Sequence, residues 1–342
     1  MNLADLNKVA QAMVTPGKGI LAADESSGTI KKRFDAINVA STEESRRDYR
    51  EMLFRSSEAM ARHISGVILY DETIWQNARD GTPLVRIIEQ AGAIPGIKVD
   101  EGTQALPNCP GELITIGLDK LAERLKKYYE RGARFAKWRA VINIDKGTIP
   151  SMTAIRANAH ALGRYAALCQ EAQIVPIVEP EVLMDGDHDI DRCYEVSQRV
   201  LNKTFQELWI QRVALEGMVL KPNMVVPGKK SPKQASVEEV AEKTVRLLKN
   251  CVPAAVPGIA FLSGGQSDED ATAHLNAMNR IGGLPWRLTF SYGRALQAAP
   301  LKAWSGKAEN VAAGQRAFSH RARMNSLASQ GEWKADLEKK AA

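Results

Sequence analysis

Phe135-Ala136-Lys137-Trp138-Arg139 is a short apolar segment that carries ionisable side chains at its end, and this combination decides the fold. Three other segments have the same form: Gly96-Ile97-Lys98-Val99-Asp100, Pro176-Ile177-Val178-Glu179-Pro180-Glu181 and Val219-Leu220-Lys221-Pro222-Asn223. A charge at the rim of an apolar core is costly unless it is paired or used. Several such strand ends in one chain predict an active site assembled from many strands.

Eight strand candidates recur along the chain, and a helical pattern follows each of them. They are approximately Gly19–Ala23, Gly66–Tyr70, Ile94–Val99, Phe135–Trp138, Val175–Glu179, Gly217–Leu220, Gly258–Leu262 and Arg287–Phe290. An open doubly wound sheet is the alternative, but no G-x-G-x-x-G or Walker loop follows any strand. The alternation therefore predicts an α/β chain that forms a single (β/α)8 TIM barrel.

Capping residues and apolar periodicity place helices between these strands. Ser41 with Glu44 predicts a capping box, which starts a helix running to about His63. Further helices are predicted from the apolar stripe 118–128 that Gly132 ends, at about 153–172 and 189–212, and after the N-caps Ser236 and Ser267. We expect a barrel with an N-terminal helical extension in residues 1–302, and a helical, then mobile, tail in residues 303–342.

The composition is that of an ordinary globular protein, since 44% of the 342 residues are hydrophobic and 25% are charged. The net charge of +6 suits an anionic ligand, although a slightly basic surface explains it equally well. The absence of Lys/Arg runs with interleaved aromatic residues argues against nucleic acid as a partner. No segment approaches the roughly 20 apolar residues of a membrane helix. Four scattered cysteines fit a reducing compartment, so we expect a cytoplasmic protein.

Alternate residues of a barrel strand point inward, and this rule groups the ionisable side chains. Lys137 and Arg139 are two residues apart and share a face, as do Glu179 and Glu181. Two further strand ends add Asp24 and Lys221. A structural ion pair explains each residue taken alone, but the joint pattern favours a catalytic site at the mouth of the barrel.

A lysine beside carboxylates in a dry site suggests Schiff-base chemistry. A lysine amine attacks a carbonyl only in its neutral form, which burial or a neighbouring cation favours. The apolar residues before Lys221 make it a good candidate, but spacing alone does not choose it over Lys98 or Lys137. The protonated imine would withdraw electrons from an adjacent carbon–carbon bond, and a glutamate would then move the protons.

Three loops have the composition of phosphate-binding turns. Leu262-Ser263-Gly264-Gly265 follows the seventh strand, and Phe290-Ser291-Tyr292-Gly293-Arg294 follows the eighth, where barrels often bind phosphate. The basic and polar loop Ser26–Arg33 follows the first strand. Glycine-rich turns are often plain turns, but two separated anion sites around an amine predict a substrate with a phosphate at each end.

Together these motifs resemble the class I fructose-bisphosphate aldolases over nearly the whole chain. The matching segments are Leu21–Ser26, Gly96–Asp100, Phe135–Arg139, Val178–Glu181, Leu220–Met224, Phe261–Ser267 and Phe290–Arg294. The resemblance implies reversible retro-aldol cleavage of fructose 1,6-bisphosphate to dihydroxyacetone phosphate and glyceraldehyde 3-phosphate, without a cofactor or a metal. It also implies a homo-oligomer, commonly a tetramer.

The resemblance assigns a role to each motif residue. Lys221 would form the Schiff base, Glu179 would accept and donate the main proton, and Asp24 would bind the C4 hydroxyl and help to deprotonate it. Lys137 and Glu181 would support proton transfer and charge balance. One phosphate would be held by Ser263, Gly264, Gly265, Ser291, Gly293 and Arg294. The other phosphate would be held by Ser26, Arg33, Lys98 and Arg139.

Well-known members of this family end in a tyrosine that assists proton transfer at C3, whereas the last tyrosine here is Tyr292. The route of that proton is therefore open, and a deletion after about Lys302 would test the tail.

The alternatives are a transaldolase-like enzyme, sedoheptulose 1,7-bisphosphate as substrate, and an idle barrel used for binding. No histidine lies at a strand end, which disfavours a zinc aldolase, and we expect Asp185-Gly186-Asp187-His188-Asp189 to be a solvated turn.

Overall fold

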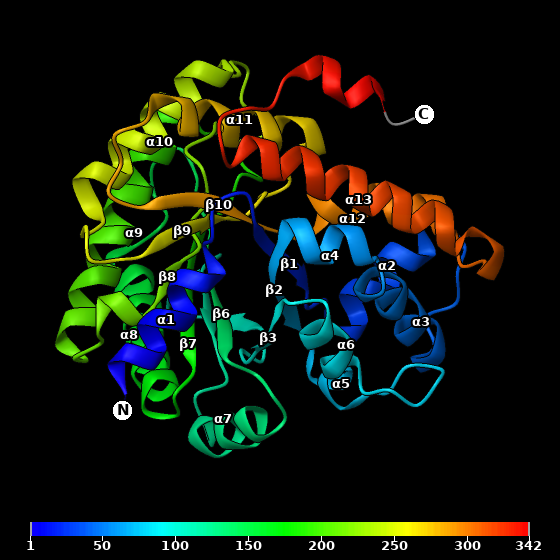
Figure 1. Cartoon of the computed structure of the whole chain (residues 1–342). Helices are drawn as coiled ribbons and strands as arrows, with labels where there is room; N and C mark the ends of the chain where they lie inside the picture. The colour runs from blue at the N-terminus through cyan, green and yellow to red at the C-terminus, as the bar shows by residue number, and fades with distance from the viewer. Residues whose placement is uncertain (1, 341–342) are drawn as a thin grey trace.

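The computed structural model describes residues 2–340, and its strands form the predicted closed barrel (Figure 1). Neighbouring strands are parallel and follow the order β1-β10-β9-β8-β7-β6-β3-β2. They are β1 (Gly19–Ala23), β2 (Ile64–Leu69), β3 (Ile94–Lys98), β6 (Phe135–Ile142), β7 (Val175–Val182), β8 (Val219–Leu220), β9 (Gly258–Phe261) and β10 (Arg287–Tyr292). The eight predicted strands are thus confirmed, although β6, β7 and β10 extend beyond their expected ends.

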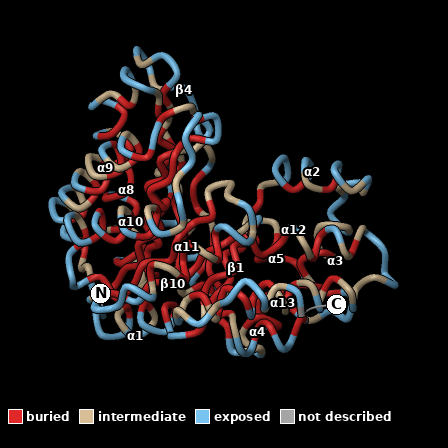
Figure 2. Tube along the Cα trace, turned by 90° about the horizontal axis from the view of Figure 1, so that it is seen from above, coloured by how far each residue is buried: buried red, intermediate tan, exposed pale blue. Residues whose placement is uncertain are grey.

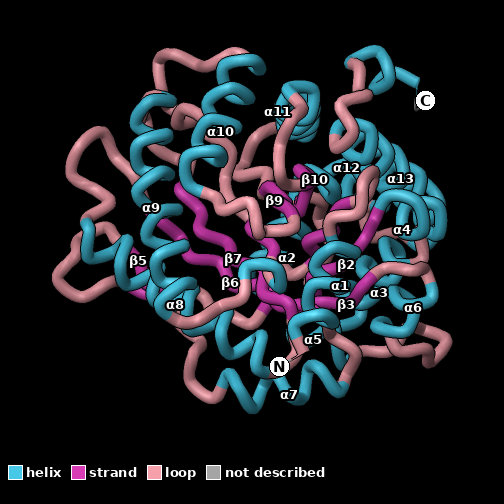
Figure 3. Tube along the Cα trace, turned by 60° about the vertical axis from the view of Figure 1, so that its left-hand side comes forward, coloured by secondary structure: helices cyan, strands magenta, loops and turns pink. Residues whose placement is uncertain are grey.

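Helices surround the barrel strands on the outside (Figure 3). They are α1 (Leu3–Met13), α2 (Ser27–Asp35), α3 (Glu43–Phe54), α4 (Ser57–His63), α5 (Asp71–Trp75), α6 (Leu84–Gln90), α7 (Leu121–Glu130), α8 (Met152–Glu171), α9 (Ile190–Ile210), α10 (Val237–Cys251), α11 (Asp268–Ile281), α12 (Arg294–Trp304) and α13 (Val311–Ala328). An unpredicted antiparallel pair, β4 (Thr103–Ala105) and β5 (Leu113–Thr115), lies apart from the barrel sheet. None of the helices within residues 2–340 has the length and apolar character needed to cross a bilayer.

Apolar side chains fill the lower part of the barrel. A methyl group on Gly96 would lie 2.2 Å from the ring of Phe135, so the barrel interior has room for that ring only because the neighbouring strand carries a glycine. Leu6 and Met13 of α1 belong to the same buried cluster as Phe135 and close the barrel from below. Buried residues run through the centre of the molecule (Figure 2). Ionisable side chains therefore have space only at the opposite, carboxyl end of the strands.

The helix that was predicted to run from Ser41 to about His63 is two helices with a different cap. The N-cap is Thr42, whose hydroxyl accepts a hydrogen bond from the Ser45 backbone N–H while the Ser45 hydroxyl accepts one from Thr42 N–H. The predicted pair of Ser41 and Glu44 is therefore wrong by one position, since several polar residues at this helix start can act as caps. The helix also breaks after Phe54, between α3 and α4.

The C-terminal segment packs against the barrel helices more closely than its polar composition indicates. Phe318 and Ala322 of α13 are fully buried, and the Ser326 hydroxyl donates a 2.6 Å hydrogen bond to the carbonyl of Gly17. Beyond α13, the carboxylate of Glu338 forms an ion pair with Arg321. The expected boundary at residue 302 falls inside α12, and Ala341 and Ala342 lie outside the described residues. A deletion after Lys302 would consequently remove part of the core.

Replacing Phe318 with alanine is expected to lower the free energy of unfolding by about 3–5 kcal/mol, because it empties a fully buried site. Urea unfolding followed by circular dichroism measures the change in midpoint. Arg316→Ala, on the exposed side of the same helix, is the matched control and should leave the midpoint unchanged. A wild-type midpoint for the Phe318→Ala variant would show that α13 is not part of the cooperative core.

Candidate active site

Side-chain alternation on β6 and β7 brings the predicted residues together at the barrel mouth. On β6, Lys137 and Arg139 line a cavity, whereas Trp138 packs outward on Tyr165 of α8 with ring centroids 5.6 Å apart. On β7, Glu179 and Glu181 line the same cavity. The strand register places Arg139 beside Glu179 across the β6–β7 pair. The predicted sharing of faces is therefore confirmed.

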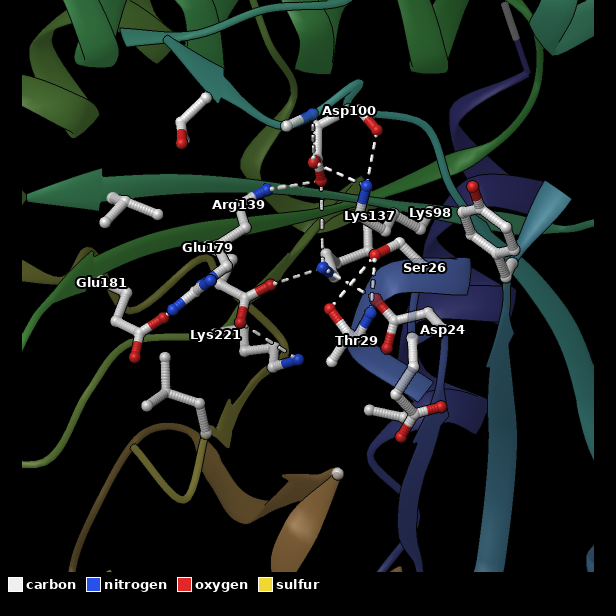
Figure 4. A pocket seen from close by; sticks show the side chains of 18 of the residues that line it. Asp24, Ser26, Thr29, Lys98, Asp100, Lys137, Arg139, Glu179, Glu181 and Lys221 are labelled. Carbon is white, nitrogen blue, oxygen red and sulfur yellow. Dashed lines mark hydrogen bonds and ion pairs between the residues drawn. The ribbon is translucent and has the colours of Figure 1, made fainter. Parts of the chain in front are cut away.

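Lys137 lies at the centre of a buried cluster of charges (Figure 4). Its Nζ is 2.8 Å from Asp24 Oδ2, 3.3 Å from Glu179 Oε2 and 3.9 Å from Asp100 Oδ2. Lys221 Nζ lies 3.2 Å from the other carboxylate oxygen, Glu179 Oε1. The side chains of Lys137, Glu179 and Lys221 are at most 5% exposed. Two lysines and three carboxyl groups are thus held away from water, where charges interact strongly.

The cluster shifts the protonation of its members in opposite directions. Burial alone would raise the pKa of Asp24, but the ammonium groups of Lys137 and Lys221 outweigh it and hold that pKa well below its ordinary value. Burial alone would lower the pKa of Lys137, but Asp24, Glu179 and Asp100 raise it well above its usual range. Asp24 is therefore a carboxylate, and Lys137 a cation, throughout the neutral pH range.

Two buried oxygens of the predicted site residues form no hydrogen bond within residues 2–340. They are Glu179 Oε2 and Ser291 Oγ. The 3.3 Å contact between Glu179 Oε2 and Lys137 is an ion pair without hydrogen-bond geometry. Because buried polar atoms are nearly always satisfied, both oxygens indicate positions that a ligand completes.

Asp100 is a member of the cluster that our choice of site residues missed. Its Oδ1 lies 2.8 Å from Lys98 Nζ, and its Oδ2 accepts a 3.2 Å hydrogen bond from the backbone N–H of Arg139. The residue follows Lys98 by two positions, just beyond β3. The alternation rule that was applied to β6 and β7 would therefore have identified it.

Arg33, a predicted phosphate ligand, is held by another residue that was not predicted. Glu25 is buried and forms an ion pair with Arg33. Gln297 of α12 donates a 2.7 Å hydrogen bond to the same carboxylate, and Arg50 donates to the backbone carbonyl of Glu25 at 2.8 Å. Ser26 is the N-cap of α2, and Arg33 lies in its last turn. This network fixes α2 and its basic side chain at the edge of the cavity.

The ends of β9 and β10 form the second predicted anion site. Gly264 and Gly265 have φ values of +58° and +86°, a conformation that glycine adopts without strain. Gly293 precedes the first turn of α12, which begins with Arg294. Backbone N–H groups at a helix start and a guanidinium are suited to a phosphate.

All predicted site residues except Gly265 line one cavity of about 1200 Å³. The cavity joins the charge cluster to both predicted anion sites, at α2 and at the ends of β9 and β10. Arg139, whose side chain is 42% exposed, forms an ion pair with Glu181 at its rim. Within residues 2–340 no group of three His, Cys, Asp or Glu side chains is placed to hold a metal ion. The cavity can hold an extended, doubly anionic molecule over the two lysines.

Known proteins resemble this chain over nearly its whole length. The family described as fructose-bisphosphate aldolase class-I matches residues 5–342. A probable fructose-bisphosphate aldolase class 1 of Xanthomonas campestris pv. campestris is 57% identical over 98% of this chain and 100% of that protein. Fructose-bisphosphate aldolase 4, cytosolic, of Arabidopsis thaliana is 55% identical over 95% of this chain and 82% of that protein.

A solved structure agrees with these matches. Fructose-bisphosphate aldolase of Plasmodium falciparum, in complex with TRAP and a small-molecule inhibitor, superposes with a TM-score of 0.94. It is 49% identical, and the match covers 97% of this chain and 96% of that one. The chain therefore belongs to the class I fructose-bisphosphate aldolases, the lyases of glycolysis that cleave fructose bisphosphate through a lysine Schiff base without a metal.

Proposed function

We propose that Lys221 is the amine that forms the Schiff base. Three lysines meet at the barrel mouth, and their surroundings differ. Lys137 contacts three carboxylates that keep it protonated, and Lys98 Nζ is bound by the carboxylate of Asp100 at 2.8 Å and by its carbonyl at 2.6 Å. Among the described residues, Lys221 has a single carboxylate partner, Glu179. Its amine is therefore the one most readily released to attack a ketone.

Glu179 is suited to carry the protons of this reaction. As the Lys221 amine adds to the C2 carbonyl, the oxygen must gain two protons before it leaves as water. One is the proton that the nitrogen gave up to become neutral, and the other is the proton that it loses on addition. Glu179 Oε1 is 3.2 Å from that nitrogen, and Oε2 is buried without a hydrogen bond. The same carboxylate can therefore accept a proton from the lysine nitrogen and then donate it to the substrate oxygen.

Cleavage of the C3–C4 bond follows from the same geometry. The C4 hydroxyl loses its proton, the aldehyde forms at C4, and the bonding electrons move to the iminium nitrogen as an enamine. Asp24 is a weak base because its pKa is depressed, so its role is to accept a hydrogen bond from the hydroxyl while Glu179 takes the proton. Lys137, which is charged and 2.8 Å from Asp24, balances the carboxylates. Glu181 and Arg139 close the rim of the site as an ion pair.

The two anion sites would hold the two phosphates of the substrate. Ser263, Gly264, Gly265, Ser291, Gly293 and Arg294 form one site, and Ser26, Arg33, Lys98 and Arg139 form the other. Location in the cytosol is supported by the Arabidopsis thaliana relative, which is named cytosolic. A homo-oligomer, a tetramer as in the family, stays a prediction.

The proposal is tested by trapping the intermediate. Wild-type protein is incubated with dihydroxyacetone phosphate, reduced with borohydride, digested and mapped by mass spectrometry. We expect one covalent adduct, on the peptide that contains Lys221, and we expect the chelator EDTA to leave activity unchanged. An adduct on Lys98 or Lys137 would identify that lysine, rather than Lys221, as the nucleophile. The absence of any adduct would overturn the Schiff-base assignment.

A further inference from the structure

Lys229 belongs to a loop that is fixed beside the active site, although nothing in its sequence marked it as functional. The loop after β8 is joined to the loop after β7 by backbone hydrogen bonds. Lys229 N donates to Met184 O at 2.8 Å, and Gly228 N donates to His188 O at 2.8 Å. A methyl group on Gly228 would lie 2.2 Å from Gly186 O, so this contact depends on glycine.

The loop at residues 185–189 matches the expected solvated turn only in part, since Asp185 and Asp189 are exposed whereas His188 is not. His188 is only 1% exposed, and its carbonyl takes part in the backbone contact with Gly228. The backbone of Lys229 is therefore fixed where the loop after β8 meets the loop after β7. A side chain on such a backbone has a defined direction, which is a requirement for a binding residue.

The Lys229 side chain reaches the anion site at the ends of β9 and β10. A methyl group added to Gly265 would lie 2.6 Å from Lys229 Nζ and 3.0 Å from Arg294 Nη2. The ammonium and the guanidinium thus face a common point over this glycine. This arrangement places two cations, one in the loop after β8 and one at the start of α12, next to the backbone turn of residues 263–265.

The positive charges of Lys229 and Arg294 are incompletely balanced by carboxylates. Lys229 Nζ lies 3.0 Å from Asp185 Oδ1, and both side chains are exposed, at 40% and 67%. Within residues 2–340, Arg294 forms no ion pair. An exposed lysine–carboxylate pair is weak, whereas a phosphate dianion between two cations forms stronger, charge-assisted bonds.

We propose that Lys229 is a further phosphate-binding residue of this aldolase, which exchanges its contact with Asp185 for the substrate phosphate bound at Ser263–Gly265 and Arg294. The inference rests on the proposed phosphate site and adds to it a residue from a third loop. Lys229 acts on binding rather than on bond cleavage, because its ammonium faces Gly265 and Asp185 rather than the charge cluster around Lys137. Its removal should therefore raise KM and leave kcat nearly unchanged.

Lys229→Gln is the test, with Lys230→Gln as the matched control on the exposed neighbouring residue. Steady-state kinetics with fructose 1,6-bisphosphate should show a KM about tenfold higher for Lys229→Gln, with kcat within about twofold of wild type. The inhibition constant of inorganic phosphate should rise in the same variant. Lys230→Gln should match the wild type in both measurements, and Lys229→Arg should restore most of the binding because it keeps the charge.

The outcomes separate this inference from the proposed mechanism. A wild-type KM and phosphate inhibition constant for Lys229→Gln, or equal changes in Lys230→Gln, would overturn the role of Lys229. Borohydride trapping of dihydroxyacetone phosphate at saturation should still modify Lys221 in the Lys229→Gln variant. Failure to trap any adduct in the wild-type protein would instead overturn the Schiff-base assignment and leave the binding measurements valid.

Discussion

Replacing Lys221 with alanine is expected to lower kcat by a factor on the order of 10⁵, because the covalent intermediate cannot form without the amine. The barrel should stay folded. The lost side chain leaves Glu179 without its 3.2 Å partner, but Lys137 remains 3.3 Å from the same carboxylate and keeps it compensated. The loss of stability should therefore stay below the roughly 3–5 kcal/mol of a fully uncompensated buried charge. Aldolase kinetics and thermal unfolding measure the two quantities.

Lys221→Arg separates the nucleophile from the ion pair. Arginine keeps a positive charge beside Glu179, but its guanidinium does not deprotonate in proteins and forms no Schiff base. We expect this variant to be as inactive as Lys221→Ala. Lys126→Ala, at an exposed position of α7, should retain full activity. Activity above about 1% of wild type in Lys221→Arg would show that charge, rather than a nucleophilic amine, is what position 221 supplies.

Local rules predicted the barrel and most of its mouth, because the strand period of two residues is fixed by covalent geometry. Once β6 was recognised, Lys137 and Arg139 had to share a face, and Glu179 and Glu181 followed in the same way on β7. Asp100 was missed although the same parity applies to it through Lys98, which precedes it by two residues on β3. Glu25 was missed because its importance depends on Gln297 and Arg50, which are distant in sequence and meet it only in the fold.

The sequence could not rank the three lysines, because the ranking depends on which carboxylate and carbonyl oxygens approach each ammonium in space. The three carboxylates around Lys137 come from three different strand ends. The close packing of the predicted tail helix was also missed for a long-range reason. Polar residues of α13 such as Arg321 and Asn325 suggest a surface helix, but both are buried and both contact Thr272 of α11 through hydrogen bonds.

Replacing Lys137 with methionine should lower kcat by a factor on the order of 10³, and it should shift the acid limb of the pH profile upward. Methionine approximates the length of lysine but removes the one cation within residues 2–340 that contacts Asp24, Glu179 and Asp100 together. Burial already acts to raise the pKa of Asp24, and Lys137 is the strongest influence that lowers it. Without that cation the pKa of Asp24 should rise, so the carboxylate becomes protonated at a higher pH and holds the C4 hydroxyl less well.

The same change should alter the pH dependence of stability with a definite sign. In the wild type, the pKa of Asp24 is lower in the folded chain than in the unfolded chain, so the folded state binds fewer protons. Its contribution to stability is therefore present above about pH 4 and is lost as the pH falls through the folded value. In Lys137→Met this contribution should shrink, so unfolding midpoints measured from pH 7 down to pH 2 should start lower than those of the wild type and fall by less below about pH 4. Lys146→Met, which removes an exposed ion pair with Asp187, is the control and should follow the wild-type curve. Identical acid limbs and unfolding curves for Lys137→Met and the wild type would show that Lys137 does not control the protonation of this cluster.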